Sequence, residues 1–265
     1  MSRESTELRV GVDAGSTTWK AVAIDGDGRV VAVRIEPCEP RVDEQTRRGL
    51  EELLRPFGGG RPAGLGATGY GRKRVPDATS RVTEIAAHAA GAARLVPSAG
   101  FVLDVGGQDA KAIRLGPGGR ALEFAMNDRC AAGTGRFLEN ALGRLKLGWD
   151  ELDRTVRAAA RPARISSTCA VFAETEIVGL LADGVAVPDV VRGLVESLAE
   201  RLAALVSQVR PDGPVAATGG VARASALLEA VAARVGRPVR AAPDPQLAGA
   251  LGAAILAAPA GRSSG

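Results

Sequence analysis

Three glycine-rich turns along the chain carry residue types that suit phosphate binding. Phosphate groups need backbone N–H donors that glycine leaves open to close approach, together with small hydroxyls and a cation. The turn from Gly15 to Lys20 offers all three directly after Asp13, a second turn from Gly106 to Asp109 follows Asp104, and the third is 219–221. A single turn of this kind can also be explained as an ordinary hairpin that uses glycine for a positive φ. Three in this order, two of them with aspartates, predict a site for a nucleotide with Mg²⁺.

Segments rich in β-forming residues position the first two turns. We expect strands at Leu8–Ala14, Trp19–Ile24 and Val30–Ile35, joined as an antiparallel meander, and again at Phe101–Val105, Ala110–Leu115 and Ala121–Ala125. In both sets a strand runs into an aspartate, a glycine turn follows, and a second strand returns. The recurrence at Asp13 and Asp104 predicts an internal duplication of domain size.

Apolar periodicity of the helical kind accounts for most of the remaining chain. The expected helices are Asp43–Arg55, Thr83–Val96, Ala132–Leu145, Ala170–Ala182, Asp189–Val209, 219–235 and Gln246–Ala257, with a late strand at Val215–Thr218. The fold class is therefore α/β, with mixed sheets flanked by helices. We place a first subdomain at 1–96 and a second at 97–265, the second including helical segments beside Cys130 and Cys169.

Composition narrows the class of protein further. With 265 residues, 46% apolar and 24% charged, the chain is typical of a globular protein that needs no disulfide framework. Its apolar runs are too short to span a membrane, and Met1–Arg9 has no apolar signal core, so a cytoplasmic location is expected. The net charge of +4 comes from scattered arginines, and only 3% of residues are aromatic, which argues against nucleic-acid binding.

The cysteines have spacing and neighbours that allow metal binding. Cys130 and Cys169 each precede an expected helix, whose N-terminus lowers the pKa of a thiol. Either one could equally be a small buried apolar side chain. Two thiolates per chain cannot complete a four-thiolate site, but a two-fold dimer would supply four, enough for one [4Fe–4S] cluster. From the residues alone, zinc binding or a redox-active thiol ranks ahead of that cluster. The single histidine, His88, is expected in the core.

The three turns match neither a Walker A loop nor a dinucleotide-binding fingerprint. Their pattern resembles the superfamily of actin, the heat-shock chaperone ATPases and the sugar kinases. This resemblance implies two acidic loops that clamp the β- and γ-phosphates across an interdomain cleft. It implies Mg²⁺ held through water by Asp13 and Asp104, and an attacking water positioned by Gln108 or Asp104, which makes these three the expected catalytic residues. The implied cofactor-binding residues are Gly15, Ser16, Thr17, Thr18, Lys20, Gly106, Gly107, Gln108, Gly219, Gly220, Val221 and Gln246.

A closer resemblance covers nearly the full length of the chain. The segments that carry it are GVDAGSTTWK (11–20), ATGYGR (67–72), TEIAAHAAGA (83–92), DVGGQDAK (104–111), MNDRCAAGTGRFLE (126–139), SSTCAVFAETE (166–176), ATGGVAR (217–223) and PQLAGALGAA (245–254). Together they resemble the activator components of 2-hydroxyacyl-CoA dehydratases, in the wider ATPase family that includes benzoyl-CoA reductase subunits.

That resemblance implies a homodimer in which Cys130 and Cys169 of both subunits hold one bridging [4Fe–4S] cluster. It implies an ATP-dependent one-electron donor that reduces an iron–sulfur 2-hydroxyacyl-CoA dehydratase and is itself reduced by ferredoxin or flavodoxin. ATP and ADP with Mg²⁺ are the implied nucleotide ligands. Cys38 matches no ligand position of the family.

Three other functions stay open at this point. The chain could be the nucleotide-binding subunit of a benzoyl-CoA-type reductase, whose motifs barely differ from those of an activator. A small-molecule kinase of the same fold would need a sugar-binding carboxylate near the cleft and no metal at the cysteines. A non-enzymatic ATP-binding scaffold is disfavoured by the paired acidic loops.

Overall fold

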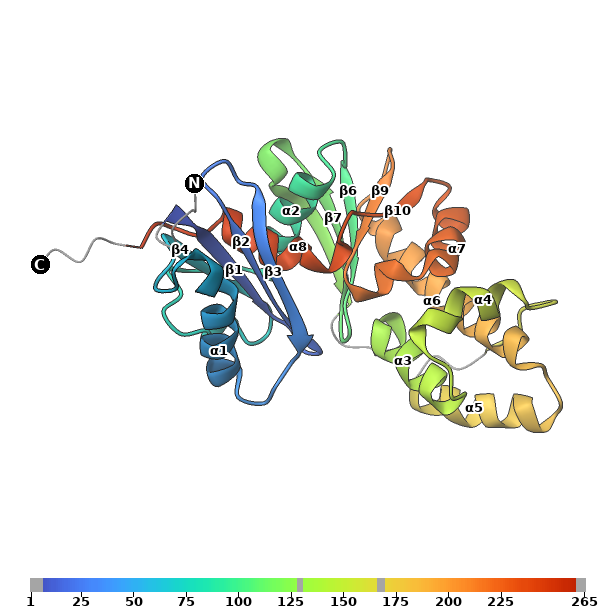
Figure 1. Cartoon of the computed structure of the whole chain (residues 1–265). Coiled ribbons are helices and arrows are strands. Elements are labelled where there is room, and N and C mark those ends of the chain that lie inside the picture. Colours follow the sequence, from blue (N-terminus) through green and yellow to red (C-terminus); the bar gives the residue numbers. More distant parts are fainter. Residues whose placement is uncertain (1–6, 128–130, 166–169, 261–265) are drawn as a thin grey trace, which may run out of the picture. The chain divides into compact units, whose positions relative to one another are not determined.

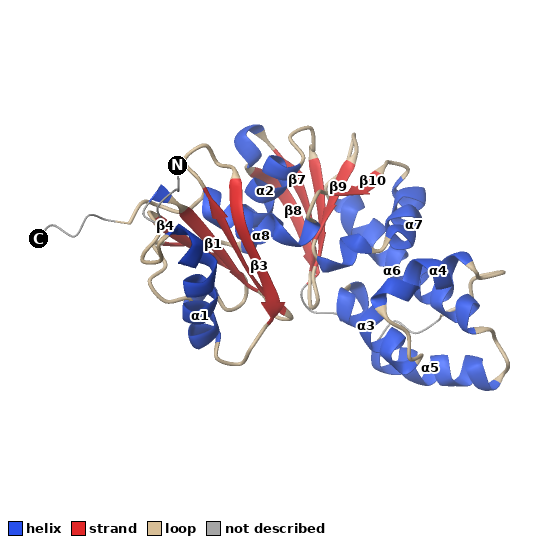
Figure 2. Cartoon of the chain, viewed as in Figure 1, coloured by secondary structure: helices blue, strands red, loops and turns tan. Residues whose placement is uncertain are grey.

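A computed structural model describes residues 7–127, 131–165 and 170–260 (Figure 1). These residues form two units, each built on its own five-stranded sheet (Figure 2). Unit 1 takes the chain up to Ser98, the short segment Gly116–Ala121 and the chain from Gln246 onward, whereas unit 2 takes Ala99–Leu115 and Leu122–Pro245. Within the described ranges, no helix combines the length and the apolar character needed to cross a membrane.

The sheet of unit 1 has the strand order β3-β2-β1-β4-β5. Strands β1 (Arg9–Ala14), β2 (Thr18–Ile24) and β3 (Val30–Pro37) form the predicted antiparallel meander. Strand β4 (Gly64–Thr68) pairs parallel to β1, and the short β5 (Ser80–Arg81) pairs parallel to β4. The sequence pattern does not predict β4, because glycine occupies two of its five positions and leaves no alternation of side chains to detect.

Helices α1 (Val42–Leu54), α2 (Glu84–Leu95) and α8 (Ala248–Ile255) complete unit 1. The predicted boundaries place the last helix in the second subdomain, but α8 packs against β1, β2, β4 and α2. The reason is steric: Cβ atoms at Gly11 and Gly66 would overlap the backbone of α8, and one at Gly252 would overlap the backbone of α2. Small residues on both sides of this contact let the backbones approach closely, which an apolar run alone does not reveal.

The sheet of unit 2 repeats the arrangement of unit 1, in the order β10-β9-β6-β7-β8. Its strands are β6 (Phe101–Val105), β7 (Ala110–Leu115), β8 (Ala121–Asn127), β9 (Val215–Thr218) and β10 (Val239–Ala241). Strand β6 pairs antiparallel with β7 and parallel with β9, as β1 does with β2 and β4. The duplication that the sequence predicts is therefore confirmed, and it extends to the parallel strand that the sequence pattern missed in unit 1.

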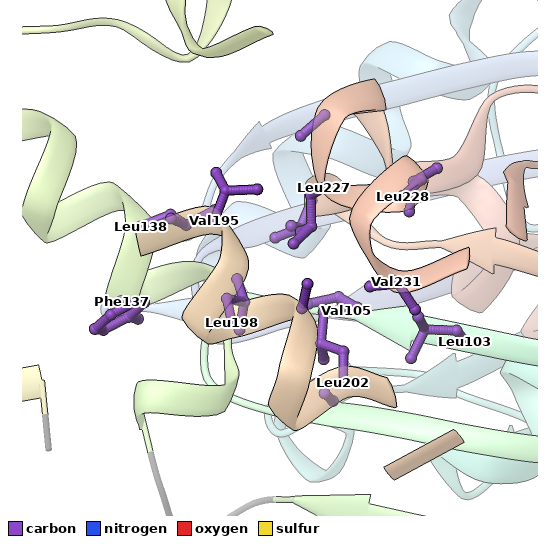
Figure 3. Packing of buried hydrophobic residues seen from close by; sticks show 14 of the residues in the cluster. Leu103, Val105, Phe137, Leu138, Val195, Leu198, Leu202, Leu227, Leu228 and Val231 are labelled. Atoms are coloured by element: carbon purple, nitrogen blue, oxygen red, sulfur yellow. The ribbon is translucent and has the colours of Figure 1, made fainter. Parts of the chain in front are cut away.

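The helices that the structure describes in unit 2 pack partly on its sheet and partly on one another. They are α3 (Gly135–Arg144), α4 (Leu152–Arg157), α5 (Ala170–Ala182), α6 (Val187–Gln208) and α7 (Ser225–Val235). Leucine and valine side chains of β6, α6 and α7 interlock in one buried cluster, together with Phe137 and Leu138 of α3 (Figure 3). Helix α7 begins at Ser225 and not at Gly219 as predicted, because Gly219 has a φ of +87° and a 3-10 turn, Gly220–Arg223, intervenes.

The start of α7 is held by a carboxylate of α4. Asp153 accepts hydrogen bonds from the backbone N–H and the hydroxyl of Ser225, at 3.0 and 2.7 Å, and from the N–H of Ala226 at 2.9 Å. Burial raises the pKa of Asp153, but the bonds from Ser225 and Ala226 outweigh it and lower the pKa below its ordinary value. The N-terminus of α7 is thus fixed next to the third glycine turn.

Candidate functional site

The first predicted turn joins β1 to β2 and ends on a buried ion pair. Asp13 is the register partner of Lys20, its side chain is only 6% exposed, and its Oδ2 lies 3.0 Å from Lys20 Nζ. The N–H of Gly15 donates to the carbonyl of Thr18, and the N–H of Cys38 donates to the carbonyl of Thr17. The predicted residues of this turn, Gly15, Ser16, Thr17 and Thr18, are all partly exposed, although the Thr17 hydroxyl itself is buried and has no hydrogen-bond partner among the described residues.

Cys38, which we expected to have no part in the site, therefore braces the first turn through its backbone. Burial raises the pKa of the Cys38 thiol above its ordinary value. His88 of α2 is buried, as expected. Its Nε2 and Asp13 Oδ2 each lie 2.9 Å from the point where a Cβ at Gly249 would sit, so the imidazole and this carboxylate are close neighbours.

Strand β4 adds two residues to the first turn that the sequence did not indicate. Thr68 is the parallel register partner of Asp13 and is completely buried. Gly69, which follows it, has a φ of +87°, and a Cβ there would lie 2.6 Å from Asp13 Oδ1. The sequence feature that could have indicated these two residues is the tripeptide Ala-Thr-Gly, which occurs at 67–69 and again at 217–219.

The second predicted turn joins β6 to β7 and rests on a denser polar cluster. Asp104 is the register partner of Lys111, whose Nζ lies 3.6 Å from Asp104 Oδ2 and 2.7 Å from Asp109 Oδ1. Thr218 of β9 donates to Asp104 Oδ1 at 2.8 Å. All of these side chains are buried. Two carboxylates around one ammonium give these three groups a net negative charge, which suits a nearby cation such as Mg²⁺.

The second turn is also docked onto the start of α3. The carbonyls of Gly106 and Gly107 accept hydrogen bonds from the N–H groups of Gly135 and Arg136, at 2.9 and 3.0 Å. Gln108, at the tip of the turn, is exposed. Unsatisfied N–H groups at a helix N-terminus seek such acceptors, so this contact fixes the turn relative to α3.

The third predicted turn meets the second at the same helix start. A Cβ at Gly219 would lie 3.0 Å from Asp104 Oδ1, and the Gly219 N–H donates to the carbonyl of Pro245 at 2.8 Å. A Cβ at Gly135 would lie 2.6 Å from Val221 Cγ2 and 2.9 Å from the Gly106 carbonyl oxygen. Gly135 is therefore the point at which the two turns and α3 approach most closely.

A pocket of about 480 Å³ opens beside the third turn, within the size range of small-molecule sites. Apolar and charged side chains share its lining, which consists of Ala222, Arg223, Ser225, Leu228, Glu229, Val239, Arg240, Ala241 and Pro245. None of the predicted residues Gly219, Gly220 and Val221 lines it, although the lining begins with the next residue. Gln246 follows Pro245 in the chain but belongs to unit 1.

Cys130 and Cys169 lie outside the described residues, so the predicted cluster ligands are not placed. Helix α5 begins at Ala170, directly after Cys169, as predicted. After Cys130 only a three-residue 3-10 turn, Ala131–Gly133, follows, and α3 begins at Gly135 and not at Ala132 as predicted. Helices α3 and α5 contact each other, and Arg144 of α3 lies 3.5 Å from Glu174 of α5. Among the residues that the structure does describe, no three His, Cys, Asp or Glu side chains are grouped to hold a metal ion.

Comparisons with known proteins agree with this geometry. Residues 10–257 match the profile of the BadF/BadG/BcrA/BcrD ATPase family. The activator of lactoyl-CoA dehydratase from Anaerotignum propionicum is 40% identical over 94% of this chain and 96% of its own length. The activator of the 2-hydroxyisocaproyl-CoA dehydratase from Clostridium difficile, solved with bound ADPNP, is 36% identical over 94% of both chains with a TM-score of 0.87. A ROK family glucokinase from Streptomyces griseus shares the fold alone, at 16% identity over 94% of this chain and 99% of its own, with a TM-score of 0.57.

Proposed function

Because the chain belongs to the BadF/BadG/BcrA/BcrD ATPase family, we propose that it is an ATP-dependent activator of a 2-hydroxyacyl-CoA dehydratase. In this role it hydrolyses ATP and delivers single electrons to the dehydratase. The names of the similar activators support this assignment. The observation that carries it is the junction at Gly135, which connects two nucleotide-binding turns to the chain that follows Cys130.

Each unit by itself contains residues that suit nucleotide binding. The first turn offers the hydroxyls of Ser16 and Thr18 and the ammonium of Lys20 to phosphate. Asp13 and the cluster around Asp104 supply the carboxylates that hold Mg²⁺ through water, and Gln108 or Asp104 orients the attacking water. The pocket beside the third turn accepts the nucleoside, since its volume suffices and Arg223 and Arg240 can cover a base.

The start of α3 transmits changes at the second turn. A shift of Gly106 or Gly107 breaks their hydrogen bonds with Gly135 and Arg136 unless α3 moves too. Helix α3 in turn packs on α5, the helix that follows Cys169. Arg201 of α6 adds a further bond, to the carbonyl of Ala132, at 3.0 Å. Nucleotide turnover is thereby coupled to both cysteine segments through a short series of direct contacts.

Cys130 and Cys169 of two copies would hold one [4Fe–4S] cluster, which when bound supplies a one-electron redox centre. The start of helix α5 directly after Cys169 suits an anionic thiolate there. Helix α5 exposes 69% of Phe172 and also exposes Val178, an apolar surface that fits a second copy of the chain. A homodimer reduced by ferredoxin or flavodoxin is consistent with this arrangement.

The proposal is tested by iron and acid-labile sulfide analysis of protein purified without oxygen. We expect about four irons per dimer, lost in Cys130→Ala and retained in the matched control Cys38→Ala. We also expect ATP hydrolysis that is needed for electron delivery to a 2-hydroxyacyl-CoA dehydratase. Iron-free wild-type protein, or phosphoryl transfer to a sugar, would contradict the proposal. Electron delivery only to a benzoyl-CoA-type reductase would assign the chain to that complex instead.

A further inference from the structure

The two turns that carry Asp13 and Asp104 are built alike, down to individual carboxylate oxygens. In each unit the Oδ2 atom of the aspartate faces the ammonium of the lysine that is its register partner on the antiparallel strand. In each unit Oδ1 lies close to the glycine that follows a threonine on the parallel strand, and both glycines have a φ of +87°. Thr68 and Thr218 are therefore equivalent residues in the duplicated fold.

The equivalent threonines differ in one respect. Thr218 Oγ1 donates to Asp104 Oδ1 at 2.8 Å. Thr68 Oγ1 is just as buried, but it has no hydrogen-bond partner in the part of the chain that the structure describes. A buried hydroxyl without a partner costs free energy and calls for an explanation. The duplicated turn in unit 2 suggests one, since there the equivalent hydroxyl donates to the equivalent carboxylate.

The charge on Asp13 gives the Thr68 hydroxyl a role. Asp13 is nearly buried, and the charged group that pairs with it is the ammonium of Lys20. A phosphate in the first turn draws that ammonium toward itself, which leaves the carboxylate short of a partner in a place where water is scarce. Asp104 keeps its threonine donor whether or not Lys111 moves, whereas Asp13 has no equivalent hydrogen bond from Thr68 when Lys20 moves.

We propose that Thr68 is a positioning residue for Asp13. When Mg²⁺ and a nucleotide occupy the first turn, the Thr68 hydroxyl rotates about χ1 and donates to Asp13 Oδ1, as Thr218 does to Asp104. Rotation between staggered side-chain positions needs no backbone movement. The hydroxyl then fixes the direction in which Oδ2 faces the Mg²⁺ and its water. This inference rests on the proposed ATPase function.

The experiment compares Thr68→Val, Thr68→Ser and Thr218→Val in the full-length protein. The melting temperature is measured without ligand and with Mg²⁺ and ADPNP, and kcat and KM are measured for ATP. Valine has the shape of threonine without its hydroxyl, so Thr68→Val should melt no lower than the wild type without ligand, whereas Thr218→Val should melt lower.

With Mg²⁺ and ADPNP bound, the substitution at Thr68 becomes the one with a defect. We expect Thr68→Val to lose at least half of the rise in melting temperature that Mg²⁺ and ADPNP produce in the wild type. Its kcat should fall about tenfold, equivalent to ~1.4 kcal/mol, with KM changed less than about twofold. Thr68→Ser should restore both, because it returns the hydroxyl.

Three results would overturn the inference: wild-type behaviour of Thr68→Val, a defect that Thr68→Ser does not restore, or a wild-type chain that binds no Mg²⁺–ADPNP. A wild-type chain that binds no Mg²⁺–ADPNP would also contradict the proposed function. If the wild type binds the analogue but hydrolyses no ATP, the proposed function fails alone. The role of Thr68 is then decided by the analogue-induced rise in melting temperature.

Discussion

The buried carboxylate of unit 2 accepts a threonine hydrogen bond beside its ion pair, whereas that of unit 1 has its ion pair and the His88 imidazole nearby but no such bond from the equivalent threonine. Asp104 has Lys111 and Thr218 beside it, and Asp109 shares the same ammonium. In the described chain Asp13 is paired with Lys20, and its neighbouring hydroxyl on Thr68 makes no bond. The backbone register is the same in both, so the fold does not dictate the difference; the side chains do.

This difference separates a preorganised site from an adjustable one. A fully satisfied buried network resists movement, because every displacement leaves a polar group without its partner. The second turn is further fixed by its bonds to α3. We infer that unit 2 presents a rigid surface to the nucleotide and passes its movements to the cysteine segments, whereas the first turn of unit 1 adapts to the ligand.

The largest expected effect comes from removing the ammonium at the centre of the unit 2 cluster. Lys111→Met leaves Asp104 and Asp109 buried without it, and we expect a loss of about 3–5 kcal/mol in the free energy of unfolding. The matched variant Lys20→Met should lose only about 1–2 kcal/mol, because Lys20 is partly exposed. Chemical denaturation followed by circular dichroism measures both. Equal losses in the two variants would remove the distinction between a rigid and an adjustable turn.

The hydrogen bond from Thr218 should give the next largest effect. Thr218→Val removes a bond to a buried carboxylate and should lower the free energy of unfolding by about 1.5–3 kcal/mol. The chain has two tryptophans, Trp19 in unit 1 and Trp149 in unit 2. Fluorescence of a Trp149→Phe background reports unit 1 alone, and there Thr218→Val should leave the transition unchanged. A shift in the Trp19 transition would mean that the units do not unfold independently.

A substitution at Gly135, where the two turns meet α3, should change the free energy of unfolding less, but it should act specifically on electron delivery. Gly135→Ala places a Cβ against Val221 and the Gly106 carbonyl, which should cost about 1–3 kcal/mol. Gly143→Ala on the same helix is the control, since nothing lies within 4 Å of its Cβ, and it should raise stability by about 0.5–1 kcal/mol. We expect Gly135→Ala to hydrolyse ATP with reduced electron delivery. If hydrolysis and delivery fall by the same factor, the helix start does not connect them.

The smallest effect concerns a second fixed contact of unit 2, the Asp153 carboxylate at the start of α7. Its pKa is lowered in the folded chain, so its contribution to stability is present above about pH 4 and is lost as the pH falls through the lowered pKa. Asp153→Asn should therefore cost about 1 kcal/mol at pH 7, and this cost should shrink as the pH falls through the lowered pKa of Asp153. Helix α1 of unit 1 has no side-chain cap of this kind. A difference that does not shrink as the pH is lowered would rule out the charge as its source.

Much of this architecture could be predicted because it follows from patterns in the sequence itself. The two meanders, the aspartates that end β1 and β6, and most helices show clear periodicity and turn residues. Strand β4 and the position of α8 could not, because both depend on glycine and alanine, whose contribution is the space they leave free. The polar partners Lys111 and Thr218 become apparent only when the register of paired strands is known.

The packing of α8 also has a consequence for the order in which the protein is made. Its Ala250, Leu251 and Ala254 pack on Val22 and Ile24 of β2, so unit 1 takes this helix from far along the chain. Unit 2 is nearly continuous in sequence, and a ribosome adds residues in order. Unit 2 therefore forms from one nearly continuous stretch of chain, whereas the sheet that carries Asp13 keeps an uncovered apolar face until α8 has emerged. During synthesis, the early half of the protein is the last to become protected.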